Sequence, residues 1–211
     1  MRMSEVKVER NYSPNLLNWN EFEHLINIRP LMTKKRVKFF NSEQYRWTAT
    51  NWVHDPNTYP SSIMSDMLSN TICYFSDMSR CTEKINQFAT EVENEYRIST
   101  DAHIYVCRVK QEHPFGVHFD HNDNIIVQCE GETNFKVWNQ IDDRHDMSVW
   151  NNLSIEEEPI VNVDMKPGDA IWIPMYYPHL ATSQTKRLSV SFPMGRTSIE
   201  DVREEREWIT L

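Results

Sequence analysis

The sequence predicts a mainly β protein whose strands form a barrel-like double sheet, and three observations lead to this class. From residue 103 onward, short runs rich in β-branched and aromatic residues alternate with turn residues. Helical spacing of apolar residues occurs before this region and again near the C-terminal end. The chain has 211 residues, of which 39% are hydrophobic, and this suffices for one sizeable core. We therefore expect a single domain.

Two helices and one strand are expected before residue 103. Residues 17 to 29 carry apolar side chains at helical spacing, and Pro30 should end that helix. Residues 82 to 96 show the same spacing, so this helix should pack against the outside of the sheet. Residues 71 to 75 form a short apolar run that predicts a strand.

Eight short runs are then expected to be strands of the double sheet. They cover residues 103 to 109, 117 to 119, 124 to 129, 134 to 138, 160 to 163, 170 to 173, 180 to 182 and 188 to 193. Between the fourth and fifth runs lies a polar, acidic segment, residues 139 to 159, to which the sequence assigns no role.

The C-terminal end predicts a short helix. Thr197 and Glu200 have the spacing of a capping box, and residues 199 to 208 contain apolar side chains that need a partner surface. That surface could belong to the barrel or to a second copy of the chain, so a homodimer through this helix stays open. The expected division is a helical and extended flank over residues 1–70 of the same domain, a β core over 71–195, and a C-terminal helix over 196–211.

The most informative motif is His118-Phe119-Asp120, followed much later by His179. Residues two apart on a strand point to one face, so His118 and Asp120 can act together. A turn at residues 166 to 169, a buried strand at 170 to 173 and a break at 174 to 178 should deliver His179 to the mouth of the sheet. Two imidazoles and one carboxylate are the ligand set of a non-haem iron(II) site with open positions.

Other histidines offer a competing interpretation. His113, His118 and His121 could form a zinc cluster, but this arrangement leaves His179 and its proline-flanked strand without a purpose. The remaining histidines have no partner spacing and are expected to be surface or structural residues: His24, His54, His103 and His145.

Residues 70 to 194 resemble the JmjC-like hydroxylases of the cupin superfamily, whose fold is a double-stranded β-helix, also called a jelly-roll or cupin barrel. In the first half, His118, Asp120, Asn124 and Gly131 fall at the spacings of that family. In the second half, the spacing of the second cupin motif is kept by Gly168, Pro174 and His179, whereas Tyr176 stands where that motif usually has glycine.

The resemblance implies an oxygenase that uses iron(II), 2-oxoglutarate and dioxygen. His118, Asp120 and His179 are then both metal ligands and catalytic residues. The expected reaction is hydroxylation of a C–H bond, on a protein or peptide side chain or, alternatively, on a small molecule or free amino acid. A cupin fold retained as a binding module without turnover is the third possibility.

The anchor for the distal carboxylate of 2-oxoglutarate departs from the family. JmjC-like hydroxylases usually place a lysine two residues after the glycine that corresponds to Gly131, and this chain has Thr133 there. Lys136 follows on the same strand, but its odd spacing from Thr133 points it to the other face. Thr133 and Lys136 are both retained as candidates.

Arg187 and Ser189 offer another anchor. They match the Arg-x-Ser pattern on the last strand of other 2-oxoglutarate oxygenases, although the spacing from His179 is slightly short. The alternative for Arg187 is a surface residue in a hairpin. Asn124 and Tyr105 are further hydrogen-bonding candidates by position.

Charge and composition restrict the partners and the location. The formal net charge of −9 argues against a phosphate-binding surface, and residues 34 to 38, which are basic, run into Phe39 and are better read as a strand with a charged lead-in. No apolar run is long enough to span a bilayer, and the start lacks the order of a signal peptide. The four cysteines show no CxxC pair and are expected to be reduced. We expect a soluble, cytoplasmic protein.

Overall fold

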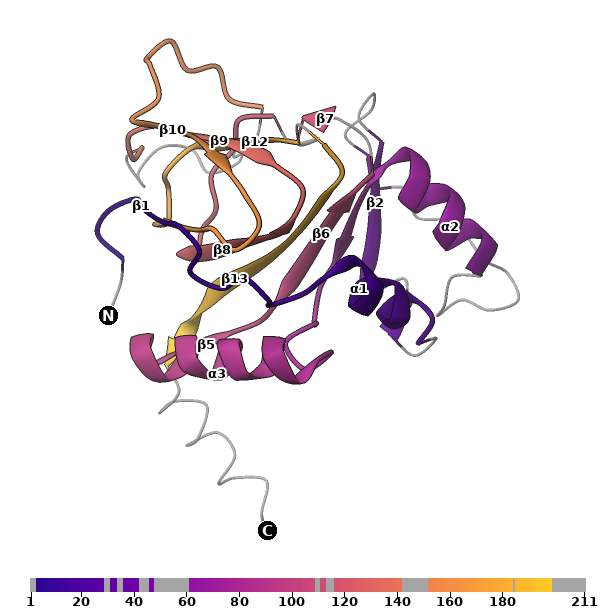
Figure 1. Cartoon of the computed structure of the whole chain (residues 1–211). Coiled ribbons are helices and arrows are strands. Elements are labelled where there is room, and N and C mark those ends of the chain that lie inside the picture. The colour runs from indigo at the N-terminus through magenta and orange to yellow at the C-terminus, as the bar shows by residue number, and fades with distance from the viewer. Residues whose placement is uncertain are drawn as a thin grey trace.

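Two antiparallel sheets face each other in the computed structural model, and the helices lie outside the larger sheet (Figure 1). The structure describes residues 3–28, 31–33, 36–41, 46–47, 61–108, 111–112, 116–141, 152–183 and 185–198. This arrangement agrees with the predicted mainly β, jelly-roll class, although the two sheets do not close into a continuous barrel. The predicted C-terminal helix lies outside the described residues.

The larger sheet has the strand order β1-β11-β8-β13-β6-β4-β2-β3, with β5 paired to β13. The bounds of these strands are β1 Lys7–Glu9, β11 Ala170–Ile173, β8 Asn124–Glu130, β13 Arg187–Ser198, β6 His103–Cys107, β4 Ile72–Phe75, β2 Val37–Asn41, β3 Arg46–Trp47 and β5 Ile98–Thr100. The smaller sheet has the order β10-β9-β12-β7. Its strands are β10 Val161–Met165, β9 Thr133–Val137, β12 His179–Ser183 and β7 Gln111–Glu112.

Helices α1 (Trp19–Ile26) and α3 (Glu83–Tyr96) confirm the two predicted helices. Asn18 caps α1 in a reciprocal capping box with Glu21, and Thr82 caps α3 by accepting a hydrogen bond from the N–H of Ile85. Helix α2 (Ser61–Asn70) was not predicted. Its serine-rich sequence has weak helical propensity, and the burial of Met64 and Leu68 against the larger sheet supplies the missing stability.

The main hydrophobic core lies between the helices and the outer face of the larger sheet. On β13, Leu188, Val190 and Phe192 belong to this core and are fully buried. The alternating residues of the strand point instead toward the smaller sheet. These are polar, and they are also buried: Arg187, Ser189 and Ser191. The space between the sheets is therefore lined partly by polar side chains.

Most predicted strands are confirmed, with ends shifted by one or a few residues. The exception is residues 117 to 119, where only His118 forms an isolated bridge, to His179. Strand β1 was missed because it has only three residues, two of them charged, and its pairing with β11 is a tertiary contact. Of the acidic segment 139 to 159, residues 142 to 151 lie outside the described part.

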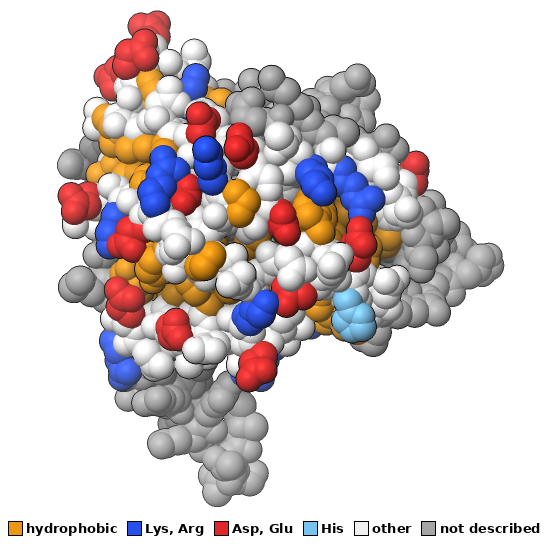
Figure 2. All heavy atoms as spheres, in the orientation of Figure 1, with side chains coloured by type: hydrophobic (Ala, Val, Ile, Leu, Met, Phe, Trp, Pro, Cys, Tyr) orange, Lys and Arg blue, Asp and Glu red, His pale blue; other side chains and the backbone are white. Residues whose placement is uncertain are grey.

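Charged side chains of both signs are mixed on the visible surface, and the cysteines are not bonded to one another. On the face shown in Figure 2, the basic side chains of the described residues are interspersed with acidic ones. The four cysteines are free, and burial raises the pKa of Cys73, Cys81 and Cys129 to about 12, so these thiols stay protonated. No helix among the described residues is long and apolar enough to cross a membrane.

Candidate metal centre

His118, Asp120 and His179, here called the triad, come together between the two sheets. Their candidate ligand atoms all lie within 4.8 Å of one another. A backbone bridge holds the two histidines side by side, with 3.0 Å between His118 N and His179 O and 2.7 Å between His179 N and His118 O. The structure thus joins two motifs that are far apart in the sequence, and an ion between them would be coordinated from both.

Each histidine ring is oriented by its own backbone contact. Nδ1 of His118 lies 3.0 Å from the carbonyl oxygen of Gly116, and Nδ1 of His179 lies 3.0 Å from that of Tyr177. Because a carbonyl only accepts, both Nδ1 atoms carry the proton and both Nε2 atoms keep a lone pair for a metal. Burial and the neighbouring His179 lower the pKa of His118 to about 4, so this imidazole is neutral near pH 7.

Asn124 orients the carboxylate of the triad. Its Nδ2 donates to Oδ2 of Asp120 at 3.3 Å, and its Oδ1 accepts a hydrogen bond of 2.8 Å from Ser191 Oγ. The same Asp120 oxygen lies 3.8 Å from Nε2 of His179. Asn124, predicted as a co-substrate contact, therefore touches a triad residue directly.

Tyr176 occupies the position where the second cupin motif usually has glycine. It has a φ of 66°, the left-handed conformation for which glycine is the usual residue. Its N–H donates to the carbonyl of Asp120 at 2.9 Å, and its ring packs edge-on against Phe119 and His121. Here a tyrosine adopts this strained backbone conformation, and its ring packs against the segment that carries His118 and Asp120.

A cavity between the sheets begins at the triad, and its lining includes Tyr105, Asn124, Phe135 and Arg187. Arg187 is only 3% exposed, which excludes the surface-hairpin alternative. Its Nε donates to Ser189 Oγ at 2.9 Å, and its guanidinium carbon lies 5.7 Å from the ring centre of Tyr105 and 5.6 Å from that of Phe135. Burial lowers its pKa to about 10, so Arg187 remains a cation near pH 7.

Among the described residues, three buried polar atoms on the cavity side of the sheets have no hydrogen-bond partner. They are Oγ1 of Thr133, Oγ of Ser183 and Oε1 of Gln128. Thr133 lies opposite Ser183 in the register of β9 and β12, and Gln128 lies opposite Ser189 in that of β8 and β13. Buried polar atoms normally have partners, so these three atoms are available to bind a polar ligand or water.

The structure separates the two basic candidates. Thr133, Phe135 and Val137 are buried on one face of β9, whereas Lys136 is half-buried on the other face and does not line the cavity. The sequence analysis missed Ser183 and Gln128. Their signal was the two-residue period that starts at His179 and at Asn124, which places residues 183 and 128 on the cavity face.

The zinc-cluster alternative is not supported by the described residues. Among them, the cluster of possible metal ligands is the triad, and His121 instead packs against Phe119 and Tyr176. His113 lies outside the described residues. Asp120 and His179, which the zinc interpretation left aside, are thus the partners of His118.

Comparisons with known proteins agree with the fold. Three structures of Escherichia coli YcfD are similar to this chain. The X-ray structure has a TM-score of 0.62 and 14% identity, and covers 94% of this chain and 52% of that one. The structure described as a ribosomal oxygenase with cobalt and 2-oxoglutarate has a TM-score of 0.63 and 15% identity, covering 95% and 50%. That with cobalt and succinic acid has a TM-score of 0.61 and 16% identity, covering 94% and 50%.

These likenesses establish the fold, and the chain spans about half the length of YcfD. No curated protein matches the sequence. The family model of the JmjC domain matches residues 75–202, which is more than half of the chain. The chain therefore belongs to the JmjC domain family.

Proposed function

We propose that this chain is an iron(II)- and 2-oxoglutarate-dependent oxygenase that hydroxylates a C–H bond. The observation that carries the proposal is the pairing, in one cavity, of a triad of possible metal ligands with the buried cation Arg187. A buried charge without a counter-ion is costly, and among the described residues no carboxylate forms an ion pair with Arg187. A small dicarboxylate that chelates a metal at one end and meets Arg187 at the other satisfies both features.

The donor set of the triad suits iron(II). The two imidazoles, through Nε2, and one carboxylate would hold the ion on one face, and Asn124 would keep Asp120 in place. When bound, iron(II) with 2-oxoglutarate and dioxygen places one oxygen atom in the substrate as a hydroxyl and the other in succinate, with release of carbon dioxide. The protein's own part is to bind, orient and exclude water.

The distal carboxylate of 2-oxoglutarate would be held by Arg187, with Ser189 fixing the guanidinium and Thr133 donating its unpartnered hydroxyl. Hydrogen bonds to charged groups are stronger than neutral ones, and they gain further inside a low-dielectric cavity. Tyr105 would cover this subsite with its ring. In this proposal Lys136 has no role, because it lies on the outer face of β9.

The substrate is proposed to be a protein or peptide side chain. The name of YcfD as a ribosomal oxygenase and the net charge of −9, which favours a cationic partner, support this choice. A small-molecule substrate and a binding module without turnover are the alternatives. The module was suggested by the missing lysine at residue 133, and the cation that Arg187 places in the cavity weakens that argument. A cytoplasmic location and a homodimer through the C-terminal segment remain proposals.

The test is an anaerobic titration of the apoprotein with iron(II) and then with 2-oxoglutarate, followed by the visible charge-transfer band of the chelate. We expect the band in the native protein and in His24→Ala, a control at an exposed residue of α1. His179→Ala should lose it. Iron binding by the native protein without a band on addition of 2-oxoglutarate would contradict the proposal.

A further inference from the structure

A second set of polar side chains lies on the cavity face of the larger sheet, beyond the triad. On the neighbouring strands β8, β13, β6 and β4, the residues are Asn124, Ser191, His103 and Tyr74. Ser191 lies opposite His103 in the register of β13 and β6, and Tyr74 lies opposite Tyr105 in that of β4 and β6. The sequence analysis gave His103 no partner, whereas the structure gives it two.

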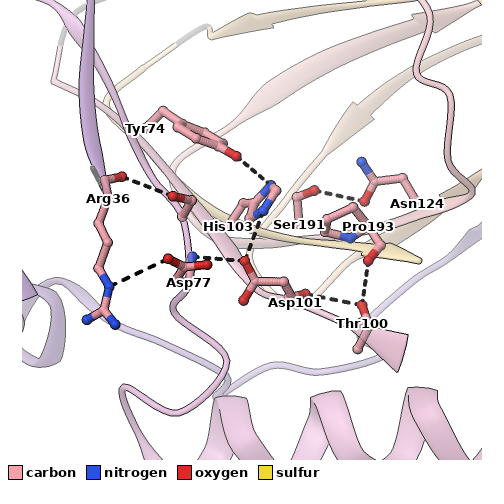
Figure 3. A network of polar contacts seen from close by, with 10 residues as sticks. Arg36, Tyr74, Asp77, Thr100, Asp101, His103, Asn124, Ser191 and Pro193 are labelled. Carbon is pink, nitrogen blue, oxygen red and sulfur yellow. Dashed lines mark hydrogen bonds and ion pairs between the residues drawn. The ribbon is translucent and has the colours of Figure 1, made fainter. Parts of the chain in front are cut away.

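His103 links Tyr74 to Asp101 through its two ring nitrogens (Figure 3). Tyr74 Oη lies 2.8 Å from Nδ1 of His103, and Nε2 of His103 lies 3.1 Å from Oδ2 of Asp101. The N–H of Asp77 donates to the same Asp101 oxygen at 2.8 Å. We call Asp101, His103 and Tyr74 the relay.

The charge of Asp101 sets the direction of these hydrogen bonds. Burial alone would raise the pKa of Asp101, but the contacts with His103 and with the N–H groups of Ala102 and Asp77 lower it below its ordinary value. The carboxylate therefore accepts from Nε2–H of His103. With the ring proton on Nε2, Nδ1 of His103 accepts a hydrogen bond from the Tyr74 hydroxyl, and the two contacts fix both rings.

The relay supports a wall of the cavity. The ring of Tyr74 packs at 5.1 Å and 58° against the ring of Tyr105, and Tyr105 lines the cavity and lies 5.7 Å from the guanidinium carbon of Arg187. Among the described residues, the side chain of Arg187 has one hydrogen bond, to Ser189, and its guanidinium is otherwise flanked by the rings of Tyr105 and Phe135. A continuous series of contacts therefore runs from Asp101, at the surface side, to Arg187.

We propose that Asp101, His103 and Tyr74 are positioning residues that hold Tyr105, and through it Arg187, in the orientation that receives the distal carboxylate of the co-substrate. This inference rests on the proposed function. Its physical basis is preorganisation: a guanidinium that is already oriented loses less freedom on binding and binds its anion more tightly. The relay acts on one end of the co-substrate and leaves the metal end alone.

The experiment compares Tyr74→Phe and Asp101→Asn with Tyr96→Phe, a control that removes a hydroxyl at the end of α3. Affinity for 2-oxoglutarate is measured from the chelate band of the iron(II) protein. Pyruvate is the second probe, because it has the metal-chelating 2-oxo acid group but no distal carboxylate. We expect both relay variants to bind 2-oxoglutarate about 3- to 10-fold more weakly, the equivalent of one neutral hydrogen bond. Pyruvate affinity should not change.

A spectroscopic readout accompanies the titrations. ¹⁵N NMR of His103 should report a proton on Nε2 in the native apoprotein, and Asp101→Asn should shift the ring toward a mixture of tautomers. If the native protein binds 2-oxoglutarate and the relay variants bind it with the same affinity, the positioning role of the relay is refuted and the proposed function still stands. Equal weakening for 2-oxoglutarate and pyruvate would also refute the positioning role, since that result reports a general structural loss. Absence of a band in the native protein would refute the proposed function and the relay together.

Discussion

Arg187 and Thr133, the residues proposed to bind the distal carboxylate, lie on two different strands. The position where JmjC-like hydroxylases usually have a lysine, on β9, holds Thr133, whereas a cation lies on β13 at Arg187. Both side chains are buried, at 0% and 3% exposure, and both face the space between the sheets. The guanidinium is flanked by two aromatic rings, which suit a planar cation better than an ammonium group.

At the scale of a residue, Arg187→Met should remove the proposed anchor of the distal carboxylate and leave the metal site intact. We expect about 10- to 100-fold weaker binding of 2-oxoglutarate to the iron(II) protein, the value of a hydrogen bond to a charged group. Iron affinity should be unchanged. Lys136→Met is the matched control, because it makes the same kind of change on the outer face of β9. The measurement is the co-substrate dependence of the chelate band, and a loss caused by Lys136→Met rather than Arg187→Met would reverse the assignment.

Residue-scale prediction from sequence succeeded where strand periodicity decides the answer. The alternation of side chains along β9 was enough to place Lys136 on the opposite face from Thr133, and Lys136 lies there in the structure. Ser183 and Gln128 were missed because serine and glutamine on a strand are usually exposed. Their burial depends on the second sheet lying over them, and the identity of these two residues does not predict that packing.

At the scale of an element, the turn from β8 to β9 depends on Gly131. Its φ is 74°, and a Cβ built there would lie 1.6 Å from the carbonyl oxygen of Lys186. The turn thus packs directly against the backbone that leads into β13, and its neighbour Glu132 donates its N–H to Thr185 Oγ1 at 2.9 Å. This contact holds the start of β13, and with it Arg187, against the hairpin that carries Thr133.

We expect Gly131→Ala to destabilise the apoprotein by at least about 2 kcal/mol, because the new Cβ meets backbone and the left-handed conformation is strained for alanine. Urea unfolding measures the loss. Glu132→Ala is the control, since its side chain is exposed and the contact uses its backbone. Equal stability of the two variants would show that the hairpin can move away from residues 185 and 186 at little cost.

Element-scale prediction depended on how local the signal is. Helices α1 and α3 have strong apolar periodicity and capping residues, so sequence reasoning found them. Helix α2 and strand β1 lack such signals and are formed by packing and by pairing with distant residues. The bridge of His118 to His179 shows the same limit: the run 117 to 119 looks like a strand, but its ladder is a single bridge.

At the scale of the whole molecule, the N-terminal segment is bound to the turn before β11 by hydrogen bonds and an ion pair. Asp169 accepts hydrogen bonds from the N–H of Asn11 and of Lys166, at 3.0 Å and 2.9 Å, and pairs with the guanidinium of Arg10. Arg10 also donates to the carbonyl of Asp164 at 2.7 Å, on β10 of the smaller sheet. The sequence could place Asp169 in a turn, but two of its partners, Arg10 and Asn11, precede it by 159 and 158 residues, and only the fold brings them together.

These contacts of Asp169 predict a pH-dependent contribution to the free energy of unfolding. Burial acts to raise the pKa of Asp169, but the N–H groups of Lys166 and Asn11 and the charge of Arg10 outweigh it, so the pKa is lowered. A lowered folded-state pKa means that the stabilisation is fully present above the unfolded-state value of about 4 and is lost as the pH falls through the folded-state pKa. Asp169→Asn should therefore cost about 1–3 kcal/mol at pH 7, since an amide cannot satisfy the same donors. The cost should shrink as the native carboxylate becomes protonated below pH 4.

Urea unfolding of the apoprotein at several pH values measures the cost of Asp169→Asn, and Glu156→Gln at an exposed residue is the control. A cost that stays constant down to the lowest pH at which the protein folds would show that the effect comes from the shape of the side chain and not from its charge.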